Sequence, residues 1–277
     1  MTSRRPGDRG GDEPWPDSSP AGSAPTSEQP RAGGTDDIAD LFLAAWSVTQ
    51  DARTTEPELL PVHLARACLA VLPADGAGLS ALNDDFRVPL GASDDTATLA
   101  ERLQFTQGEG PCLDSARSQS VLVADTGRLE RSWPAFTQEL FAHTPYRAIM
   151  TLPLKIEQAT YGAVDLYFTD AARVGEVSLA DALTVTESVV EALAMARHIG
   201  ATAVAEGYQE PDWLQGPAAR DRTYVWVAMG MVMARDCVTA PDALALLRAY
   251  AYGHDTTLDD VAVGLITGTL DVRQLEA

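Results

Sequence analysis

The sequence predicts an α+β fold: an antiparallel sheet with flanking helices, one long connecting helix, and then an all-α segment of three helices. Three observations lead to this prediction. Apolar residues first recur every three or four positions, and then gather in short runs bounded by turn residues. A long alanine-rich stretch, about 178–205, holds no proline and no glycine before Gly200. After a breaker-rich connection at 207–217, the apolar spacing is helical to the end of the chain.

The charge and cysteine content argue against a protein that binds nucleic acid or membranes through its overall charge, and against one built on disulfides. The 277 residues carry 40 acids against 20 bases, a net charge of −20, which predicts a soluble protein that bulk nucleic acid and anionic membranes repel. Lys155 is the only lysine, so nearly every base is arginine. Cys68, Cys112 and Cys237 are widely spaced, which favours reduced thiols in a cytoplasmic protein over a disulfide framework or a metal pair. No apolar run reaches the ~20 residues of a membrane span.

The ordered region is expected to begin with two helices. Residues 1–35 are predicted to be a disordered tail, because 17 of them are Gly, Pro or Ser. The following stretch, 36–50, has the one-face spacing of a helix at Ile38, Leu41, Phe42, Ala45 and Trp46. A second helix begins near Pro57 and has one apolar face made by Leu64, Ala67, Cys68 and Val71.

Short runs bounded by turn signals then predict strands, at 76–82, 120–125, 147–156 and 161–168. The last two are separated by "EQAT", which has the length of a hairpin connection. Helices are expected at 95–106 and 133–143. The stretch "GEGPC" is expected to turn into a short helix with Pro111 at its first position.

The long helix presents an apolar seam suited to pairing with a second copy of the chain, formed by Leu179, Leu183, Thr186, Val190, Leu193 and Arg197. Three helices then fit residues 220–268.

Cap signals mark the last two of these helices. The second is capped by Thr239 and Asp242 and ends at Gly253 as a left-handed stop. The third starts at Thr257 and places Asp259 and Asp260 in its first turn, where the helix dipole favours acids.

Gly230 lies in the middle of the first of these helices, where glycine costs about 1 kcal/mol relative to alanine. Such a position favours close approach of another backbone, either a crossing helix or a nucleic acid.

The C-terminal stretch "RTYVWVAMGMVMARDCVTAPDALALLRAYAYGHDTTLDDVA" resembles the ANTAR module of bacterial transcription antiterminators. Upstream, "FTQGEGPCLDSARSQSVLVAD", "WPAF" and "RAIMTLPLKIEQATYGAVDLYF" resemble the GAF sensor domain that actinobacteria fuse to ANTAR. The resemblance implies a GAF domain at 36–175, a connecting and dimerisation helix at 176–206, a linker at 207–219 and an ANTAR domain at 220–277. It also implies a homodimeric transcription regulator, in which the GAF domain senses a small ligand or a partner. The ANTAR domain then binds stem-loop RNA in nascent transcripts and controls termination.

Site residues follow from the resemblance. The RNA-binding set is Arg222, Ala228, Gly230, Arg235, Arg248 and His254. The candidate lining of the GAF ligand pocket is Phe105, Cys112, Trp133 and Arg147. The chain departs from the family between the second and third helices, where related modules place an asparagine and bases but this chain has Asp255, Thr256, Thr257 and Asp259. Residues 218–277 hold five arginines and eight acids, a net charge of −3. An alternative is therefore a GAF dimer whose acidic ANTAR-like tail contacts a protein.

Motifs for catalysis are not found, and no enzyme is expected. The sequence holds no GxSxG elbow and no HExxH pair. The four histidines, at 63, 143, 198 and 254, lie far apart, and no metal site is predicted from them. Cys112 stands at a helix start, which lowers a thiol pKa, but a buried packing role is the alternative.

Overall fold

The computed structural model describes residues 35–49, 56–83, 86–156, 159–203 and 212–276, so most of the predicted tail lies outside the described residues. The strands are β1 (Gly76–Asn83), β2 (Phe86–Ala92), β3 (Leu122–Ala124), β4 (Ala148–Ile156) and β5 (Ala159–Phe168). The helices before residue 204 are α1 (Thr35–Thr49), α2 (Leu60–Val71), α3 (Asp95–Gln107), α4 (Pro111–Ser118), α5 (Thr126–Ser132), α6 (Pro134–His143) and α7 (Leu179–Ala203). The C-terminal helices are α8 (Pro217–Asp236), α9 (Ala240–Gly253) and α10 (Leu258–Thr267). Short 3₁₀ helices are η1 (Pro57–Leu59), η2 (Ala171–Glu176), η3 (Asp212–Gln215) and η4 (Val272–Glu276).

The strands form one antiparallel sheet in the order β2-β1-β5-β4-β3. Sequence patterning missed β2, because Pro89 and Gly91 interrupt its apolar run. Both are tolerated because β2 is an edge strand that pairs only with β1 in the described sheet. Gly91 is also needed for packing, since a Cβ there would lie 2.8 Å from the backbone nitrogen of Val62 on α2.

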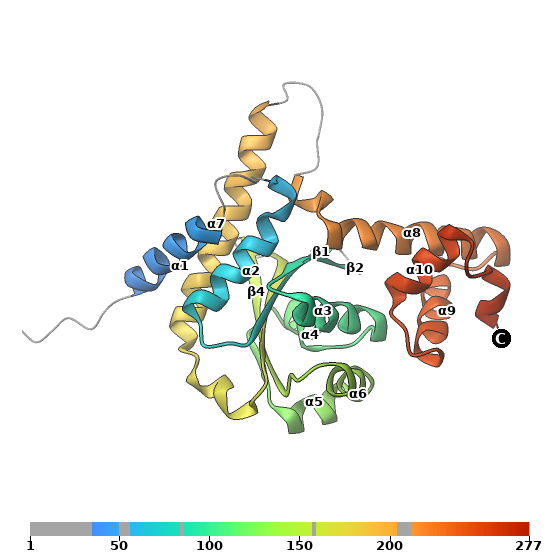
Figure 1. Cartoon of the computed structure of the whole chain (residues 1–277), viewed down its shortest axis with the longest axis horizontal. Coiled ribbons are helices and arrows are strands. Elements are labelled where there is room, and N and C mark those ends of the chain that lie inside the picture. The colour runs from blue at the N-terminus through green and yellow to red at the C-terminus, as the bar shows by residue number, and fades with distance from the viewer. Residues whose placement is uncertain (1–34, 50–55, 84–85, 157–158, 204–211, 277) are drawn as a thin grey trace, which may run out of the picture. The chain divides into compact units, whose positions relative to one another are not determined.

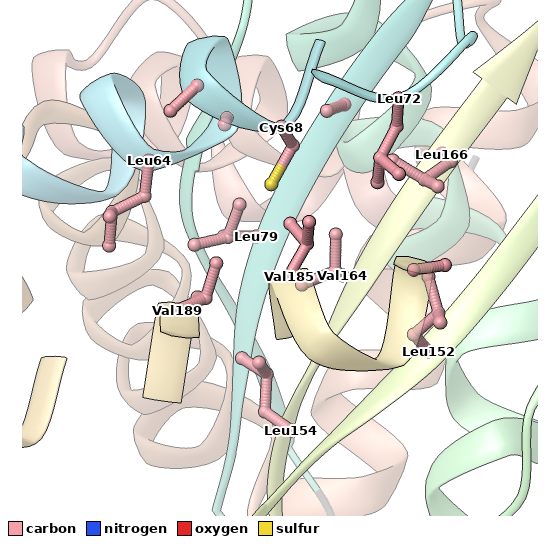
Figure 2. Close-up of a cluster of buried hydrophobic side chains, with 14 of the residues drawn as sticks. Leu64, Cys68, Leu72, Leu79, Leu152, Leu154, Val164, Leu166, Val185 and Val189 are labelled. Atoms are coloured by element: carbon pink, nitrogen blue, oxygen red, sulfur yellow. The ribbon is translucent and has the colours of Figure 1, made fainter. Parts of the chain in front are cut away.

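One face of the sheet is covered by α2 and α7, and α1 packs on these two helices (Figure 1). Figure 2 shows this core, in which side chains from α2 and α7 meet side chains from β1, β4 and β5. Leu79 and Val164 point to this face, and their chain neighbours point to the other. This alternation places a row of polar side chains on the second face of the sheet.

The second face is covered by α3 to α6 and has its own apolar core. The rings of Tyr146 and Tyr167 stack there with centroids 4.9 Å apart. Asp125 starts α5, a helix that the sequence reading missed, and accepts a hydrogen bond from the amide of Arg128 (2.8 Å).

The predicted seam on α7 is only partly available to another chain. Thr186 and Leu193 are buried in this chain's own packing, whereas Leu179 and Leu183 are exposed. The side chain of Arg197 lies outside the described residues. In the part of the chain that the structure describes, no helix is long and apolar enough to cross a membrane.

The C-terminal helices share a separate apolar core built from Val225, Ala228, Leu247, Val261 and Leu265, among others. The predicted capping box of α9 is confirmed, because Thr239 and Asp242 exchange both of its hydrogen bonds. Thr257 caps α10, also as predicted, by accepting from the amide of Asp260 (3.3 Å).

One prediction about the glycines in these helices is wrong, and one of the two alternatives for another glycine is excluded. Gly253 is not a left-handed stop: it is the last residue of α9, and the left-handed residue of the loop is Asp255, with φ +51°. An aspartate tolerates that conformation better than most side chains do. Gly230 does not lie at a helix crossing, since a Cβ there would meet no described atom within 4 Å.

Candidate functional site

Charged and polar side chains are buried between α3 and the second face of the sheet, and we call them the polar cluster: Arg87, Glu101, Gln104, Thr151, Asp165 and Tyr167. Arg87 forms an ion pair with Glu101 and also donates to its backbone oxygen (2.9 Å). The Tyr167 hydroxyl donates to Oε1 of Glu101 (2.5 Å). Thr151 and Gln104 donate to the two oxygens of Asp165, at 2.5 and 2.8 Å. Arg87 also lies 3.4 Å from Asp165, so one guanidinium faces two carboxylates, whose other contacts are hydrogen bonds from neutral side chains.

Glycines make room for the polar cluster. A Cβ on Gly78 would lie 2.2 Å from Oε1 of Glu101, and one on Gly110 would lie 2.5 Å from Oε1 of Gln104. Burial raises the pKa of Glu101 to about 7, and the nearby Arg87 opposes this shift. A buried carboxyl whose pKa is raised in this way marks the polar cluster as a candidate functional site.

The opposite face of α3 contacts the C-terminal helices. Arg102 pairs with Asp259 (3.2 Å) and with Asp260 (3.1 Å) at the start of α10. The hydroxyl of Thr106 accepts from the amide of Leu258 (3.0 Å). The acids that open α10 therefore do more than stabilise a helix start, because they hold α10 against α3.

Arg222 of α8 is buried in this contact, and its side chain is 1% exposed. Its guanidinium carbon lies 3.4 Å from the centroid of the Phe105 ring, and Nη1 lies 3.3 Å from Oδ1 of Asp259. Burial lowers the pKa of Arg222 to about 9, which leaves it charged at neutral pH. A desolvated cation over an aromatic ring is worth about 2 kcal/mol or more.

The nitrogens of Arg222 have no hydrogen-bond partner among the described residues. The 3.3 Å contact with Asp259 is thus an ion pair without hydrogen-bond geometry. A cavity of about 30 Å³ adjoins Arg222, Asp259 and Arg102, which is room for about two water molecules.

Arg248 of α9 caps the other end of this contact. Its Nε and Nη2 donate to the backbone oxygen of Phe105, at 3.3 and 3.0 Å. Gly108, with φ +70°, ends α3, and a Cβ there would lie 2.8 Å from the guanidinium carbon of Arg248. A cation at a helix C-terminus is favoured by the unpaired carbonyls and the helix dipole. We call the contact of Arg102, Phe105 and Thr106 with Arg222, Arg248 and Asp259 the docking contact.

The predicted RNA-binding residues do not share one surface: some are buried and others are exposed. Arg222 and Arg248 meet at Phe105, and Ala228 is fully buried in the core of the C-terminal helices. Gly230 is exposed, and Arg235 lies 3.2 Å from Asp236. The ring of His254 is exposed and stacks on Tyr250, with centroids 3.8 Å apart.

The four predicted pocket residues have separate environments. Phe105 belongs to the docking contact, and the backbone amide of Cys112 donates to Oε1 of Gln104 (3.2 Å). Trp133 donates from Nε1 to Asp114 (3.0 Å), and Arg147 donates to the backbone oxygens of Thr144 and Tyr146. Burial raises the pKa of the Cys112 thiol well above its ordinary value, so the buried packing role fits and the activated thiol does not.

Sequence reasoning missed the polar cluster and the docking contact. One signal was present: Asp165 stands alone in the apolar run "YGAVDLYF", and a charge inside a buried strand requires a buried partner. The partner Gln104 is 61 residues away along the chain and could not be chosen from spacing.

Comparisons with solved structures give similarities of low identity. A GAF domain of a phosphoenolpyruvate-protein phosphotransferase from Coxiella burnetii is 15% identical, with 59% of this chain and 98% of that chain covered and a TM-score of 0.40. A domain of a putative two-component sensor histidine kinase protein from Sinorhizobium meliloti is 15% identical, with 55% and 100% covered and a TM-score of 0.43. Free methionine-R-sulfoxide reductase from Neisseria meningitidis is 14% identical, with 60% and 93% covered and a TM-score of 0.40.

The comparison with curated proteins gave no match. The model of the GAF domain matches residues 54–198, which is more than half of the 277 residues. The chain therefore belongs to the GAF domain family.

Proposed function

We propose that this chain is a transcription regulator in which the GAF domain senses a small ligand or a partner and the C-terminal helices bind stem-loop RNA. A GAF domain indicates ligand sensing and signalling. The RNA-binding half of the proposal starts from the resemblance of residues 222–262 to an ANTAR module.

The exposed face of α8 is the observation that carries the RNA proposal. Arg220, Tyr224, Val227 and Gly230 recur at intervals of three or four residues and are all exposed. No described atom lies within 4 Å of a Cβ built on Gly230, so a nucleic-acid backbone can approach it closely. Exposed aromatic rings beside arginines suit the unpaired bases of RNA loops, which stack on such rings.

The docking contact provides a route for control. Helix α3 places Glu101 and Gln104 in the polar cluster and Arg102 and Phe105 against the C-terminal helices. A ligand that displaces α3 at the polar cluster would therefore also disturb the docking contact. Release of that contact frees Arg222 and Arg248 for phosphate groups. The route runs through α3, in addition to the α7 connection that the sequence suggested.

The decisive experiment measures binding of the full chain to tandem hexaloop hairpins over a salt series. The logarithm of the RNA association constant falls linearly with the logarithm of the salt concentration. Arg220→Ala is expected to make this slope shallower by about 0.7–0.9, the value for one lost phosphate contact. Tyr224→Ala is expected to cost about 1–3 kcal/mol, the value for one stacked base. Arg117→Ala, at an exposed arginine on α4, is the control and is expected to change neither.

Arg102→Glu tests the control step. It sets a third acid against Asp259 and Asp260, so the docking contact should open and RNA affinity should rise. Arg117→Glu makes the same change of charge away from the docking contact and should only weaken RNA binding slightly.

A protein partner is the second candidate function, and a specific observation favours it. Arg222 and Arg248 are engaged with Phe105, residues 218–277 are net acidic, and Tyr224, Trp226 and Val227 are exposed on α8. Absence of RNA binding at low salt, both in the wild type and in Arg102→Glu, would refute the RNA proposal. The protein partner would then be the remaining candidate.

A further inference from the structure

Three side chains with metal-ligating atoms meet between α6 and the loop that joins α9 to α10. They are Glu139, His143 and Asp255, and one ligand atom from each lies within 4.8 Å of the other two. Nε2 of His143 is 3.3 Å from Oε2 of Glu139 and 3.2 Å from Oδ1 of Asp255. Because His143 and Asp255 are 112 residues apart in sequence, only folding assembles this set.

Hydrogen bonds alone do not satisfy these three side chains, because they bring two acceptors to one possible donor. Nε2 of an imidazole carries at most one proton, so it can donate one well-directed hydrogen bond. Here two carboxylates converge on that single nitrogen at almost equal distances, and the carboxylates repel each other. A cation placed among the three atoms would be attracted to all of them and would remove the repulsion.

The two distances from the histidine nitrogen fit the spacing of ligands around a metal ion. In a tetrahedral zinc site with bonds of about 2.0–2.1 Å, neighbouring ligand atoms are about 3.3 Å apart. Both distances from Nε2 of His143 agree with that value. Glu139 and His143 are four residues apart on α6, so they lie on one helix face one turn apart.

We propose that Glu139, His143 and Asp255 form a binding site for a divalent transition-metal ion of the zinc type. One imidazole and two carboxylates leave a fourth position for water, and an imidazole ligand favours zinc over calcium or magnesium. The ion binds the unprotonated Nε2, and the imidazole keeps its proton on Nδ1. The bound ion fastens the α9–α10 loop to α6, and so adds a second attachment of the C-terminal helices beside the docking contact. The histidines had suggested no metal site from the sequence, because Glu139 was not recognised as a partner one turn before His143.

The experiment titrates zinc into the full chain after treatment with a chelator, in a Cys237→Ser background that removes the exposed thiol. Calorimetry is expected to give one zinc per chain, and cobalt is expected to give the visible absorption of a tetrahedral ion. His143→Gln and Asp255→Asn should each weaken zinc binding by about tenfold or more, since even outer-shell changes cost 10–100-fold. The matched control is His254→Gln, which changes the exposed histidine next to Asp255 and should leave the zinc affinity unchanged.

Thermal unfolding supplies a second measurement. Zinc should raise the Tm of the Cys237→Ser protein and raise that of His143→Gln by less, because a ligand stabilises the folded state in proportion to how tightly it binds. Absence of zinc binding, or equal binding by His143→Gln, Asp255→Asn and His254→Gln, would overturn the proposal. No RNA enters these measurements, so their failure leaves the proposed function untouched.

Discussion

The guanidinium carbon of Arg222 lies 3.4 Å from the centroid of the Phe105 ring, and the side chains of both residues are buried. This pair joins α8 to α3, and so joins the C-terminal helices to the GAF domain at a desolvated point. The guanidinium of Arg248 lies over the same ring at 5.4 Å, so Phe105 faces two arginines and Arg222 is the nearer one.

Phe105→Leu is expected to lower the free energy of unfolding by about 2–3 kcal/mol, since it removes a buried cation–π contact together with some apolar volume. Phe141→Leu is the matched control, because Arg147 lies 4.8 Å from that ring at a less buried position. Phe141→Leu should lower the free energy of unfolding by about 1 kcal/mol or less. Urea denaturation of both variants checks this, and equal losses would show that the Arg222 contact adds nothing.

Asp259 and Asp260 are adjacent acids that both pair with Arg102, but their burial differs. Asp259 is 1% exposed and Asp260 is 57% exposed. Asp259→Asn leaves the buried Arg222 without its counter-charge and is expected to cost about 3 kcal/mol of unfolding free energy. Asp260→Asn breaks only a screened pair and should cost about 1 kcal/mol or less. Chemical denaturation at two salt concentrations separates them, because added salt should reduce only the Asp260→Asn effect. Equal costs would contradict the buried placement of Asp259.

The sequence predicted those elements that are stabilised by residues close together in the chain. Thr239 and Asp242 are three residues apart, so their capping box could be predicted and was confirmed. β2 was missed because an edge strand tolerates Pro89 and Gly91, which would break a central strand.

The sites depend on pairs that are far apart in sequence. Arg102 and Asp259 are 157 residues apart, and nothing in their spacing indicates that they meet. The family resemblance selected Arg222 and Arg248 as RNA ligands, but it carries no information on Phe105, which both arginines contact here. Side-chain periodicity shows which residues of α3 share a face, and only the folded chain shows what covers that face.

Glu101 should make stability fall as the pH rises toward neutrality. Burial raises its pKa from 4.5 to about 7, so between these values the folded chain holds a proton that the unfolded chain has released. The stabilisation is complete below pH 4.5 and is lost as the pH rises through about 7. The full shift corresponds to about 3 kcal/mol at 1.36 kcal/mol per pKa unit.

The test compares the wild type with Glu101→Gln, which keeps the size of the side chain and removes its titration. Between about pH 5 and about pH 8, the wild type should lose unfolding free energy relative to the variant. Parallel pH profiles would show that Glu101 stays charged beside Arg87 throughout.

The three thiols should react at two very different rates. Cys237 is exposed, whereas Cys68 and Cys112 are buried. Burial raises the pKa of Cys68 to about 12 and that of Cys112 well above its ordinary value, so neither forms the reactive thiolate at neutral pH. A chromogenic disulfide reagent should therefore titrate one thiol quickly in the folded chain and the others only in denaturant. Cys237→Ser should abolish the fast phase, and a fast phase that persists would mean that Cys68 or Cys112 is accessible.

Gly230→Ala tests whether the glycine, which destabilises helix α8, is needed for RNA binding. Because a Cβ there meets no described atom within 4 Å, the substitution should raise the free energy of unfolding by about 0.5–1 kcal/mol through helix propensity. Gly264→Ala on α10 is the matched control: its Cβ would lie 3.2 Å from Cβ of Leu270, so crowding should cancel the gain. If RNA approaches α8 at Gly230, the same variant should bind the tandem hairpins more weakly although it is more stable. A gain in stability with unchanged RNA affinity would show that the open space at Gly230 is not used by RNA, and would favour a protein partner for the exposed face of α8.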